Sequence, residues 1–335
     1  MYTNGTSDHA GREDAVRAAA SLAPGIYVPT VAFFTPEDEI DVMTTRKHAL
    51  RLAAAGAAGL VTHGSNGEAV HLDAAERLLV TRTTRAALDE AGFASMPLIV
   101  GCGAQSTRET VKLCQQARAA GGTHVLILPP AYYGSLLSRR LLLAHFRAVA
   151  DRSPLPVLVY NFPAACGGLD LDSDLIVELA GHPNIVGAKL TCGNTGKLAR
   201  VVAATASTGF RTFGGSVDFT LQTLAVGGHG IIGGHGIIGG LGNIAPRTCV
   251  ELLRLGCQGE KREQAQRLQA IVARGDWVAI KGGFVSVKAG LEKYYGYGGE
   301  PRSPCAFPEG EELRRLQEGF RELVETERGL ERTAV

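Results

Sequence analysis

One apolar stretch, residues 184–191 (Asn-Ile-Val-Gly-Ala-Lys-Leu-Thr), shows which kind of sheet this chain builds. It lies between His182-Pro183 and Gly193-Asn194, and such turn-forming flanks around a short apolar run predict a buried strand. Apart from Lys189, residues 185–190 are all apolar or glycine, so the run does not alternate with polar residues. Continuous runs are typical of strands covered on both faces, as in parallel sheets packed under helices.

Runs of this kind recur along the chain, and stretches with helical periodicity separate them. Strands are predicted at residues 25–34, 59–63, 97–103, 124–128, 156–161, 185–190 and 211–214, with an eighth between 227 and 240. Helices are predicted at residues 40–55, 73–91, 107–120, 138–150 and 172–180. Eight such units favour a (β/α)8 TIM barrel over a doubly wound sheet, which usually has fewer strands.

The pattern after Pro246 is helical only, so the chain divides into three parts. Residues 1–22 are expected to be a flexible N-terminal extension, and residues 23–246 form the barrel core. Residues 247–335 supply the last barrel helix and a C-terminal helical segment, with helices predicted at 264–273, 278–294 and 310–325. We expect this segment to pack on the barrel and not to form a separate catalytic domain.

Composition limits the classes of partner. Apolar residues make up 45% of the chain, charged residues 20%, and the net charge of +1 gives no reason to expect nucleic acid or an anionic membrane as partner. The seven cysteines are scattered without a C-x-x-C pair, which suits reduced thiols. No run reaches the roughly eighteen apolar residues of a membrane span, and the first twenty residues lack the apolar region of a secretory signal. We predict a cytoplasmic protein, with the mitochondrion as the alternative compartment.

Metal and nucleotide sites are not expected. The nine histidines are dispersed, and no H-x-x-x-H or H-E-x-x-H places two imidazoles on one helix face. Matches to G-x-G-x-x-G arise only from the tandem repeat at residues 227–238, where a helix is expected before the match and the region in which an acid would be needed, residues 250–255, is dominated by leucine and arginine. We therefore predict neither a metal nor a cofactor, which favours chemistry carried by the chain's own side chains.

Two side chains in neighbouring predicted strands are candidates for that chemistry. Lys189 lies inside its apolar run, and burial favours the neutral amine, a nucleophile able to form a Schiff base with a keto substrate. The alternative is a lysine whose stem is buried while its head reaches water. Tyr160 ends the preceding strand, where a phenol could transfer protons beside an imine or simply pack its ring in the core.

Four motifs in order resemble one known family. They are residues 64–68 (Gly-Ser-Asn-Gly-Glu) after the second strand, Tyr132-Tyr133 after the fourth, residues 160–163 (Tyr-Asn-Phe-Pro) at the end of the fifth and Lys189 at the end of the sixth. Together they resemble the dihydrodipicolinate synthase / N-acetylneuraminate lyase superfamily of class I aldolases, from about residue 25 to about residue 308. The resemblance favours the Schiff-base interpretation of the lysine.

The resemblance implies a role for each matching residue. Lys189 would form an imine with C2 of a small-molecule 2-oxo acid, and Tyr160 would act as general acid and base. Ser65 and Asn66 would hold the substrate carboxylate, with the Ser65 hydroxyl joining a proton relay. Tyr133 would complete this relay from a neighbouring subunit, which implies a homo-oligomer, a dimer or a tetramer.

Two positions narrow the subgroup within the family. Ala165 stands where the synthases of lysine biosynthesis usually carry an arginine, and a methyl group cannot form the bidentate carboxylate pairing that arginine provides. The Ser-Asn pair in the loop is more similar to 4-hydroxy-2-oxoglutarate aldolase and the 2-keto-3-deoxy sugar-acid aldolases, which release pyruvate. Thr191 could add a hydroxyl to the aldehyde-side pocket, or be an ordinary β-branched residue at the end of a strand.

The tandem repeat leaves the eighth strand open. Gly-Gly-His-Gly-Ile-Ile occurs at residues 227–232 and again at 233–238, and one copy resembles the family's eighth strand. We expect the second copy to be the strand, which would place Ile238 at the substrate pocket, whereas the first copy would place Ile232 there. The leading hypothesis is a class I aldolase. The alternatives are a synthase or dehydratase using the same imine, and a relative that the repeat has impaired catalytically.

Overall fold

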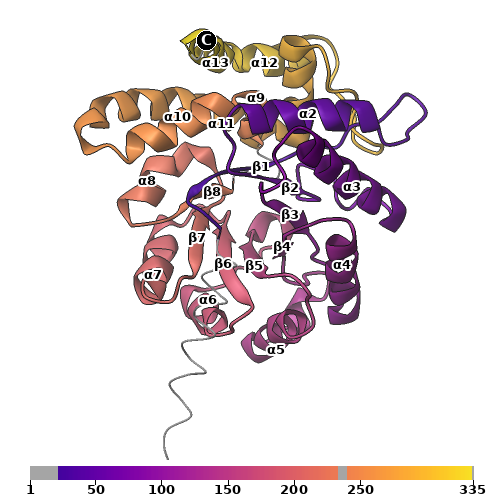
Figure 1. Cartoon of the computed structure of the whole chain (residues 1–335), viewed down its shortest axis with the longest axis vertical. Coiled ribbons are helices and arrows are strands. Elements are labelled where there is room, and N and C mark those ends of the chain that lie inside the picture. Colours follow the sequence, from indigo (N-terminus) through magenta and orange to yellow (C-terminus); the bar gives the residue numbers. More distant parts are fainter. Residues whose placement is uncertain (1–21, 233–239, 334–335) are drawn as a thin grey trace, which may run out of the picture.

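A closed barrel of eight parallel strands forms the centre of the molecule (Figure 1). The structure, a computed structural model, describes residues 22–232 and 240–333. Neighbouring strands pair in chain order, and β1 closes the barrel by pairing with β8, with Gly25 opposite Gly230. The predicted (β/α)8 TIM barrel is confirmed. Its strands are β1 (Gly25–Pro29), β2 (Gly59–Thr62), β3 (Leu98–Gly101), β4 (His124–Ile127), β5 (Val157–Asn161), β6 (Ile185–Leu190), β7 (Arg211–Gly214) and β8 (Gly230–Ile232).

Helices surround the barrel, and most of them begin at a side chain that caps the free N–H groups of the first turn. Asp41, Ser106, Asp172 and Asn194 each accept a hydrogen bond from a backbone N–H of the helix that follows. Asp73 forms a full capping box with Glu76. These helices are α2 (Val42–Ala54), α3 (Ala74–Glu90), α4 (Thr107–Ala119), α5 (Arg139–Ala150), α6 (Ser173–Ala180), α7 (Thr195–Thr205) and α8 (Thr220–Ala225).

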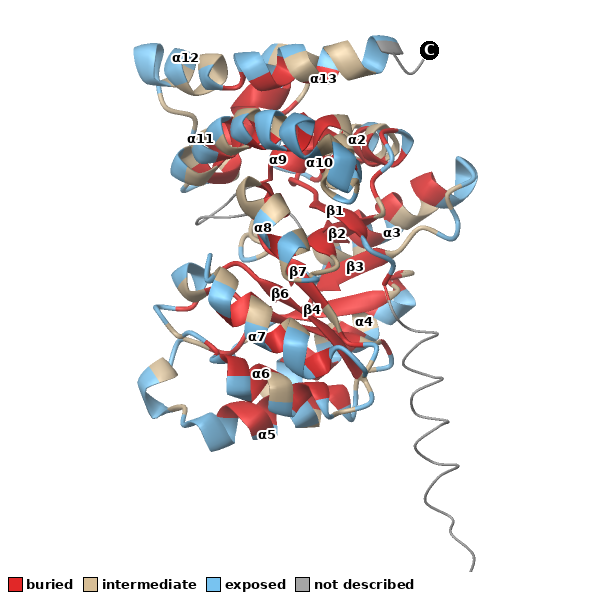
Figure 2. Cartoon of the chain, turned by 90° about the vertical axis from the view of Figure 1, so that its left-hand side faces the viewer, coloured by how far each residue is buried: buried red, intermediate tan, exposed pale blue. Residues whose placement is uncertain are grey.

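Continuous apolar strands are buried on both faces, as Figure 2 shows by their colour. One set of side chains fills the barrel interior, including Tyr27, Leu158, Val186 and Phe213. The other set packs outward against the helices. A packed interior leaves the C-terminal ends of the strands as the place where a TIM barrel carries its reactive side chains.

The eighth strand corrects the expectation drawn from the repeat. We expected the second copy of the repeat to form this strand, but the first copy, residues 227–232, forms β8. His229 N–H bonds to Thr212 O, and Gly25 N–H bonds to His229 O. This leaves only residues 226–229 between α8 and the strand, and connections in α/β units are usually that short. Using the second copy would have required a much longer connection. Ile238, the expected pocket residue, lies outside the described residues.

Helices after the barrel stack on its β1–β8 side, with α10 against β1 and the last two helices outermost (Figures 1 and 2). They are α9 (Leu241–Ile244), α10 (Pro246–Gly256), α11 (Arg262–Tyr295), α12 (Gly310–Gly319) and α13 (Arg321–Thr333). Two expected boundaries were wrong. The helices predicted at 264–273 and 278–294 form one element that kinks at Gly283 (φ 64°), and the helix predicted at 310–325 is divided at Phe320.

The kink at Gly283 has a simple physical basis. A left-handed backbone angle is accessible to glycine because it has no Cβ, and the residue is fully buried between neighbouring elements. The break therefore redirects the second half of α11 without unfolding it. Residues on both sides of the kink remain helical, which is why periodicity alone placed the boundary incorrectly.

Candidate active site

Lys189 lies near the C-terminal end of β6 and is almost completely buried, with 3% of its surface exposed. Burial lowers the pKa of its amine from 10.5 to about 7, because the charged form loses hydration. No carboxylate of the described residues forms an ion pair with it. At neutral pH a substantial fraction of the amine is therefore unprotonated, which is the form that attacks a carbonyl.

Tyr160 is the cross-strand partner of this lysine. The two residues are opposite each other in the β5–β6 ladder, and the Lys189 Nζ lies 4.2 Å from the centroid of the Tyr160 ring. Tyr160 is 3% exposed, and burial raises its pKa well above the ordinary value, whereas the nearby hydroxyls of Thr191 and Ser65 lower it. The phenol is thus protonated at neutral pH and stands ready to donate a proton beside the amine.

The loop after β2 brings Ser65 and Asn66 to the same end of the barrel. Gly67 N–H bonds to Gly64 O at 3.1 Å, which closes a tight turn, with Ser65 half-buried and Asn66 buried. A Cβ at Gly67 would lie 3.0 Å from Thr30 O, so a side chain there would crowd the backbone of the preceding loop. The loop is consequently a compact turn, from which Ser65 faces the cavity described below whereas Asn66 is not part of its wall and lies next to Gly240.

Non-glycine residues at positive φ bracket this turn. His63 has a φ of 57° and Glu68 a φ of 49°. Left-handed backbone at such residues costs about 1–3 kcal/mol each and persists only where the surroundings hold it in place. Contacts hold both side chains here: His63 Nε2 lies 2.8 Å from Thr81 Oγ1, and Glu68 is tied into a buried ion pair.

A cavity of about 350 Å³ opens beside Tyr160 and Ser65. This volume lies within the usual range for sites that bind small molecules. Its wall also includes Ala165, Cys166 and residues of the loops after β2, β3 and β4. Lys189 is not part of that wall, so Tyr160 is the residue that contacts both the cavity and the lysine amine.

The remaining predicted residues differ in where they lie. Thr191 is 2% exposed and adjacent to Tyr160, although its hydroxyl has no hydrogen bond of good geometry with the described residues. Tyr133 is 65% exposed, is absent from the cavity wall, and packs edge-on against Tyr132 with ring centroids 4.9 Å apart. Within one chain the structure thus brings together Lys189, Tyr160, Ser65 and Thr191, but not Tyr133.

Three residues of the C-terminal segment near the cavity were not predicted from the sequence. Phe284, next to the kink of α11, and Cys305 both line the cavity. Lys288 on α11 forms an ion pair with Glu68 at 3.1 Å, and both side chains are fully buried. Burial lowers the pKa of Lys288, and the Glu68 carboxylate opposes that shift. A lysine within an apolar helical stretch, residues 284–291, was the available signal, of the same kind that identified Lys189.

The sequence pattern of the dihydrodipicolinate synthetase family matches residues 23–322, which is most of the chain. The chain belongs to this family. A relative from Emericella nidulans, named probable 4-hydroxy-2-oxoglutarate aldolase, mitochondrial, is 60% identical over 92% of this chain and 98% of its own length. An L-threo-3-deoxy-hexylosonate aldolase from Hypocrea jecorina is 47% identical over 93% of this chain and 100% of its own length.

A solved structure supports the same assignment. A putative dihydrodipicolinate synthase family protein from Coccidioides immitis superposes with a TM-score of 0.82 at 32% identity, covering 93% of this chain and 99% of its own. The family membership and the prediction of an aldolase-type carbon–carbon lyase are thereby confirmed. The roles of individual site residues stay predictions.

We also searched the described residues for a metal-binding cluster and for a membrane-spanning helix. Within residues 22–232 and 240–333, no group of three or more histidine, cysteine, aspartate or glutamate side chains is arranged to hold a metal ion. In the same part of the chain, none of the helices has both the length and the apolar character that crossing a bilayer requires.

Proposed function

We propose that this aldolase cleaves a hydroxylated 2-oxo acid to pyruvate and an aldehyde through an imine on Lys189. The observation that carries the proposal is a buried amine with a pKa of about 7 beside a protonated phenol. The substrate classes are 4-hydroxy-2-oxoglutarate and 2-keto-3-deoxy sugar acids, because the two relatives with high identity are named for substrates of these kinds.

The reaction begins when the neutral Lys189 Nζ attacks C2 of the substrate. The carbinolamine loses water, with Tyr160 supplying the proton, and a protonated imine forms. The imine draws electrons from the C3–C4 bond while the C4 hydroxyl gives its proton to the relay of Tyr160 and Ser65. The aldehyde leaves, the enamine takes a proton at C3, and water hydrolyses the imine to release pyruvate and the free lysine.

Positioning is assigned to the loop after β2. Ser65 and Asn66 would bind the C1 carboxylate through their side chains and backbone N–H groups, which fixes C2 in front of the amine. Thr191 would offer its hydroxyl on the aldehyde side, next to the phenol. No metal or cofactor is required for these steps, since the protonated imine is itself the electron sink.

Assembly belongs to the same proposal. Tyr132, Tyr133 and Leu136 are 80%, 65% and 71% exposed after β4, which is unusual for side chains of this size. We propose that this surface pairs with a second copy of the chain and that Tyr133 enters the neighbour's proton relay. Light scattering of the purified protein, and turnover of Tyr133→Phe, would check the oligomer and the relay separately.

One alternative activity has a specific observation against it. A condensing synthase needs a cation for the carboxylate of its aldehyde partner, and Ala165 lines the cavity at the position where an arginine would serve. Impairment by the repeat is tested by deleting residues 233–238. Unchanged turnover would exclude an essential role for the extra copy, whereas a large gain in turnover would show that it impairs the enzyme.

The compartment stays a prediction. Cytoplasmic localisation was expected from the sequence, whereas the Emericella nidulans relative is named mitochondrial. Fractionation of cells that express the chain with a C-terminal tag would decide between the two compartments.

The direct test of the proposal is covalent trapping. Sodium borohydride reduces an imine to a stable amine, so incubation with pyruvate should attach pyruvate to Lys189, as found by peptide mass spectrometry. Lys189→Arg retains the charge and should show no adduct. Absence of the adduct in the unmodified protein would refute imine chemistry here. If the adduct forms, turnover of a panel of stereoisomeric 2-keto-3-deoxy acids would choose between an aldolase and a synthase.

A further inference from the structure

A buried ion pair joins the proposed carboxylate-binding loop to the C-terminal segment. Lys288 on α11 donates to Glu68 Oε1 at 3.1 Å, and neither side chain is exposed. Two more donors reach the other carboxylate oxygen: Arg302 N–H at 3.0 Å and His71 Nδ1 at 3.1 Å. Glu68 is thus held from three sides, and Lys288 and Arg302 come from more than two hundred residues away in the chain.

Glu68 is also part of the loop's own turn. Its N–H bonds to Ser65 O at 3.3 Å, and its backbone adopts a φ of 49°. A residue that is strained in this way relaxes unless its side chain is fixed. Relaxation at Glu68 would move Ser65 directly, because the hydrogen bond between them closes the turn.

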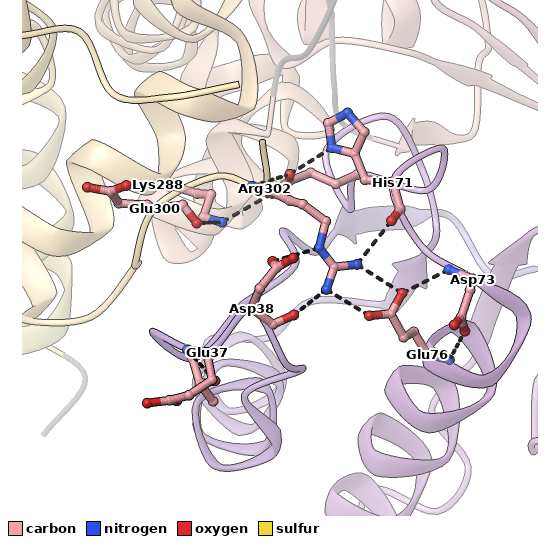
Figure 3. Close-up of polar contacts among 10 residues, drawn as sticks. Glu37, Asp38, His71, Asp73, Glu76, Lys288, Glu300 and Arg302 are labelled. Atoms are coloured by element: carbon pink, nitrogen blue, oxygen red, sulfur yellow. Dashed lines mark hydrogen bonds and ion pairs between the residues drawn. The ribbon is translucent and has the colours of Figure 1, made fainter. Parts of the chain in front are cut away.

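Residues 296–305, which we call the strap, follow α11 and fasten this arrangement (Figure 3). Glu300 O accepts from Lys288 Nζ at 2.6 Å. The Arg302 guanidinium pairs with Glu76 through two bonds of 2.9 and 2.7 Å and with Asp38 at 2.8 Å. It therefore clamps the strap to the loop before α2 and to the start of α3. A two-bond arginine–carboxylate pair fixes direction as well as distance.

The C-terminal segment also forms part of the cavity wall. Cys305 at the end of the strap and Phe284 on α11 line the same cavity as Tyr160 and Ser65. The cavity is consequently bounded on one side by elements outside the barrel. The ion pair of Lys288 ends on Glu68, which itself lines this cavity.

We propose that Lys288 and Arg302 are positioning residues, which act through Glu68 to hold Ser65 and Asn66 in the geometry that binds the substrate's C1 carboxylate. The inference rests on the proposed function, since it assumes that this loop binds that carboxylate. It changes the role of the C-terminal segment from packing alone to setting substrate affinity.

The test is the pyruvate concentration that gives half-maximal borohydride trapping at Lys189. In Lys288→Met we expect this concentration to rise about ten- to a hundredfold, because a small displacement of a positioning group costs that much. The maximum extent of trapping at saturating pyruvate should be retained, since the amine and Tyr160 are untouched. The pH at which the rate of trapping is half-maximal should also be unchanged, whereas a general loss of structure would shift it.

A matched control separates positioning from stability. Glu327 on α13 is 1% exposed and accepts from Arg247 N, Thr248 N and Thr248 Oγ1, so it also fixes the C-terminal helices without contacting the loop. Glu327→Gln should lower the melting temperature and leave the half-maximal concentration within about twofold of the unmodified protein. All measurements are made at a temperature where circular dichroism shows each variant to be folded.

The half-maximal pyruvate concentrations of the two variants decide whether Lys288 positions the loop. A half-maximal concentration for Lys288→Met within about twofold of the unmodified protein, or an equal rise in both variants, would overturn it. If Lys288→Met does not fold, Arg302→Met is used instead. It removes the guanidinium, 12% exposed, that clamps the strap to Asp38 and Glu76, and it should raise the half-maximal pyruvate concentration in the same way. If the unmodified protein forms no adduct, the proposed function fails, and pyruvate affinity measured by calorimetry tests the strap independently of the imine.

Discussion

Replacing Lys189 with methionine should make the protein more stable while abolishing its chemistry. The folded amine has a pKa of about 7, against an ordinary 10.5 in the unfolded chain. Below about pH 7 both states are protonated and the folded state bears the full penalty of burying a cation. Above 10.5 both are neutral and the penalty vanishes, so stability rises with pH between these limits.

The magnitude follows from those two values. A tenfold change in proton affinity is worth about 1.36 kcal/mol, so the penalty is about 4 kcal/mol at pH 7 and falls to roughly a third of that at pH 9.5. Methionine is similar in length, unbranched and uncharged, and it should remove this penalty with little change in packing. With an unfolding entropy of about 2.1 cal/mol/K per residue over 335 residues, 4 kcal/mol corresponds to roughly 6 °C.

Thermal unfolding of both proteins at pH 7.0 and pH 9.5, at equal protein concentration, measures the effect. The variant should melt several degrees higher at pH 7.0, and the difference should shrink to about a third at pH 9.5. A variant that is less stable at pH 7.0, or a difference independent of pH, would refute the view that Lys189 is a desolvated amine.

Three further predictions concern catalysis. The initial rate of pyruvate trapping should rise with pH and reach half its plateau near pH 7, because only the neutral amine attacks; a midpoint above pH 9 would contradict the lowered pKa. Tyr160→Phe should still bind pyruvate but lose about 10²- to 10⁴-fold in the rate of carbon–carbon cleavage, measured by release of pyruvate. Incubation with EDTA followed by desalting should leave turnover unchanged, and a loss restored by a divalent ion would disprove the metal-free mechanism.

Local sequence was sufficient where local physics decides the outcome. Residues 185–190 and 211–214 form strands with the predicted bounds, because a continuous apolar run between turn-forming residues is buried in any parallel sheet. Helix starts were predicted to within about two residues at Asp41, Asp73 and Asp172, whose side chains cap them. The errors lay elsewhere. The repeat offered two identical strands, and only the short connection from α8 selected the first.

The same division holds for the candidate site. Lys189 and Tyr160 were identified because a polar group at the end of an apolar strand is visible in the sequence, and barrel topology then places them side by side. The contacts of Lys288 and Arg302 with Glu68 were not predicted, since they span 220 and 234 positions of the sequence. No periodicity relates residues so far apart. Their proximity depends on the kink at Gly283 and the path of the strap.

By itself, the sequence determined the barrel and the burial of Lys189, because the pattern of apolar residues is a local property, and its four motifs were enough to indicate the family. Tertiary structure alone decided the pKa of that lysine, which depends on how completely other elements exclude water from it. It also decided which copy of the repeat closes the barrel and which distant charges meet in the buried Lys288–Glu68 pair at the loop after β2. These are properties of packing, and packing is specified only when the whole chain has folded.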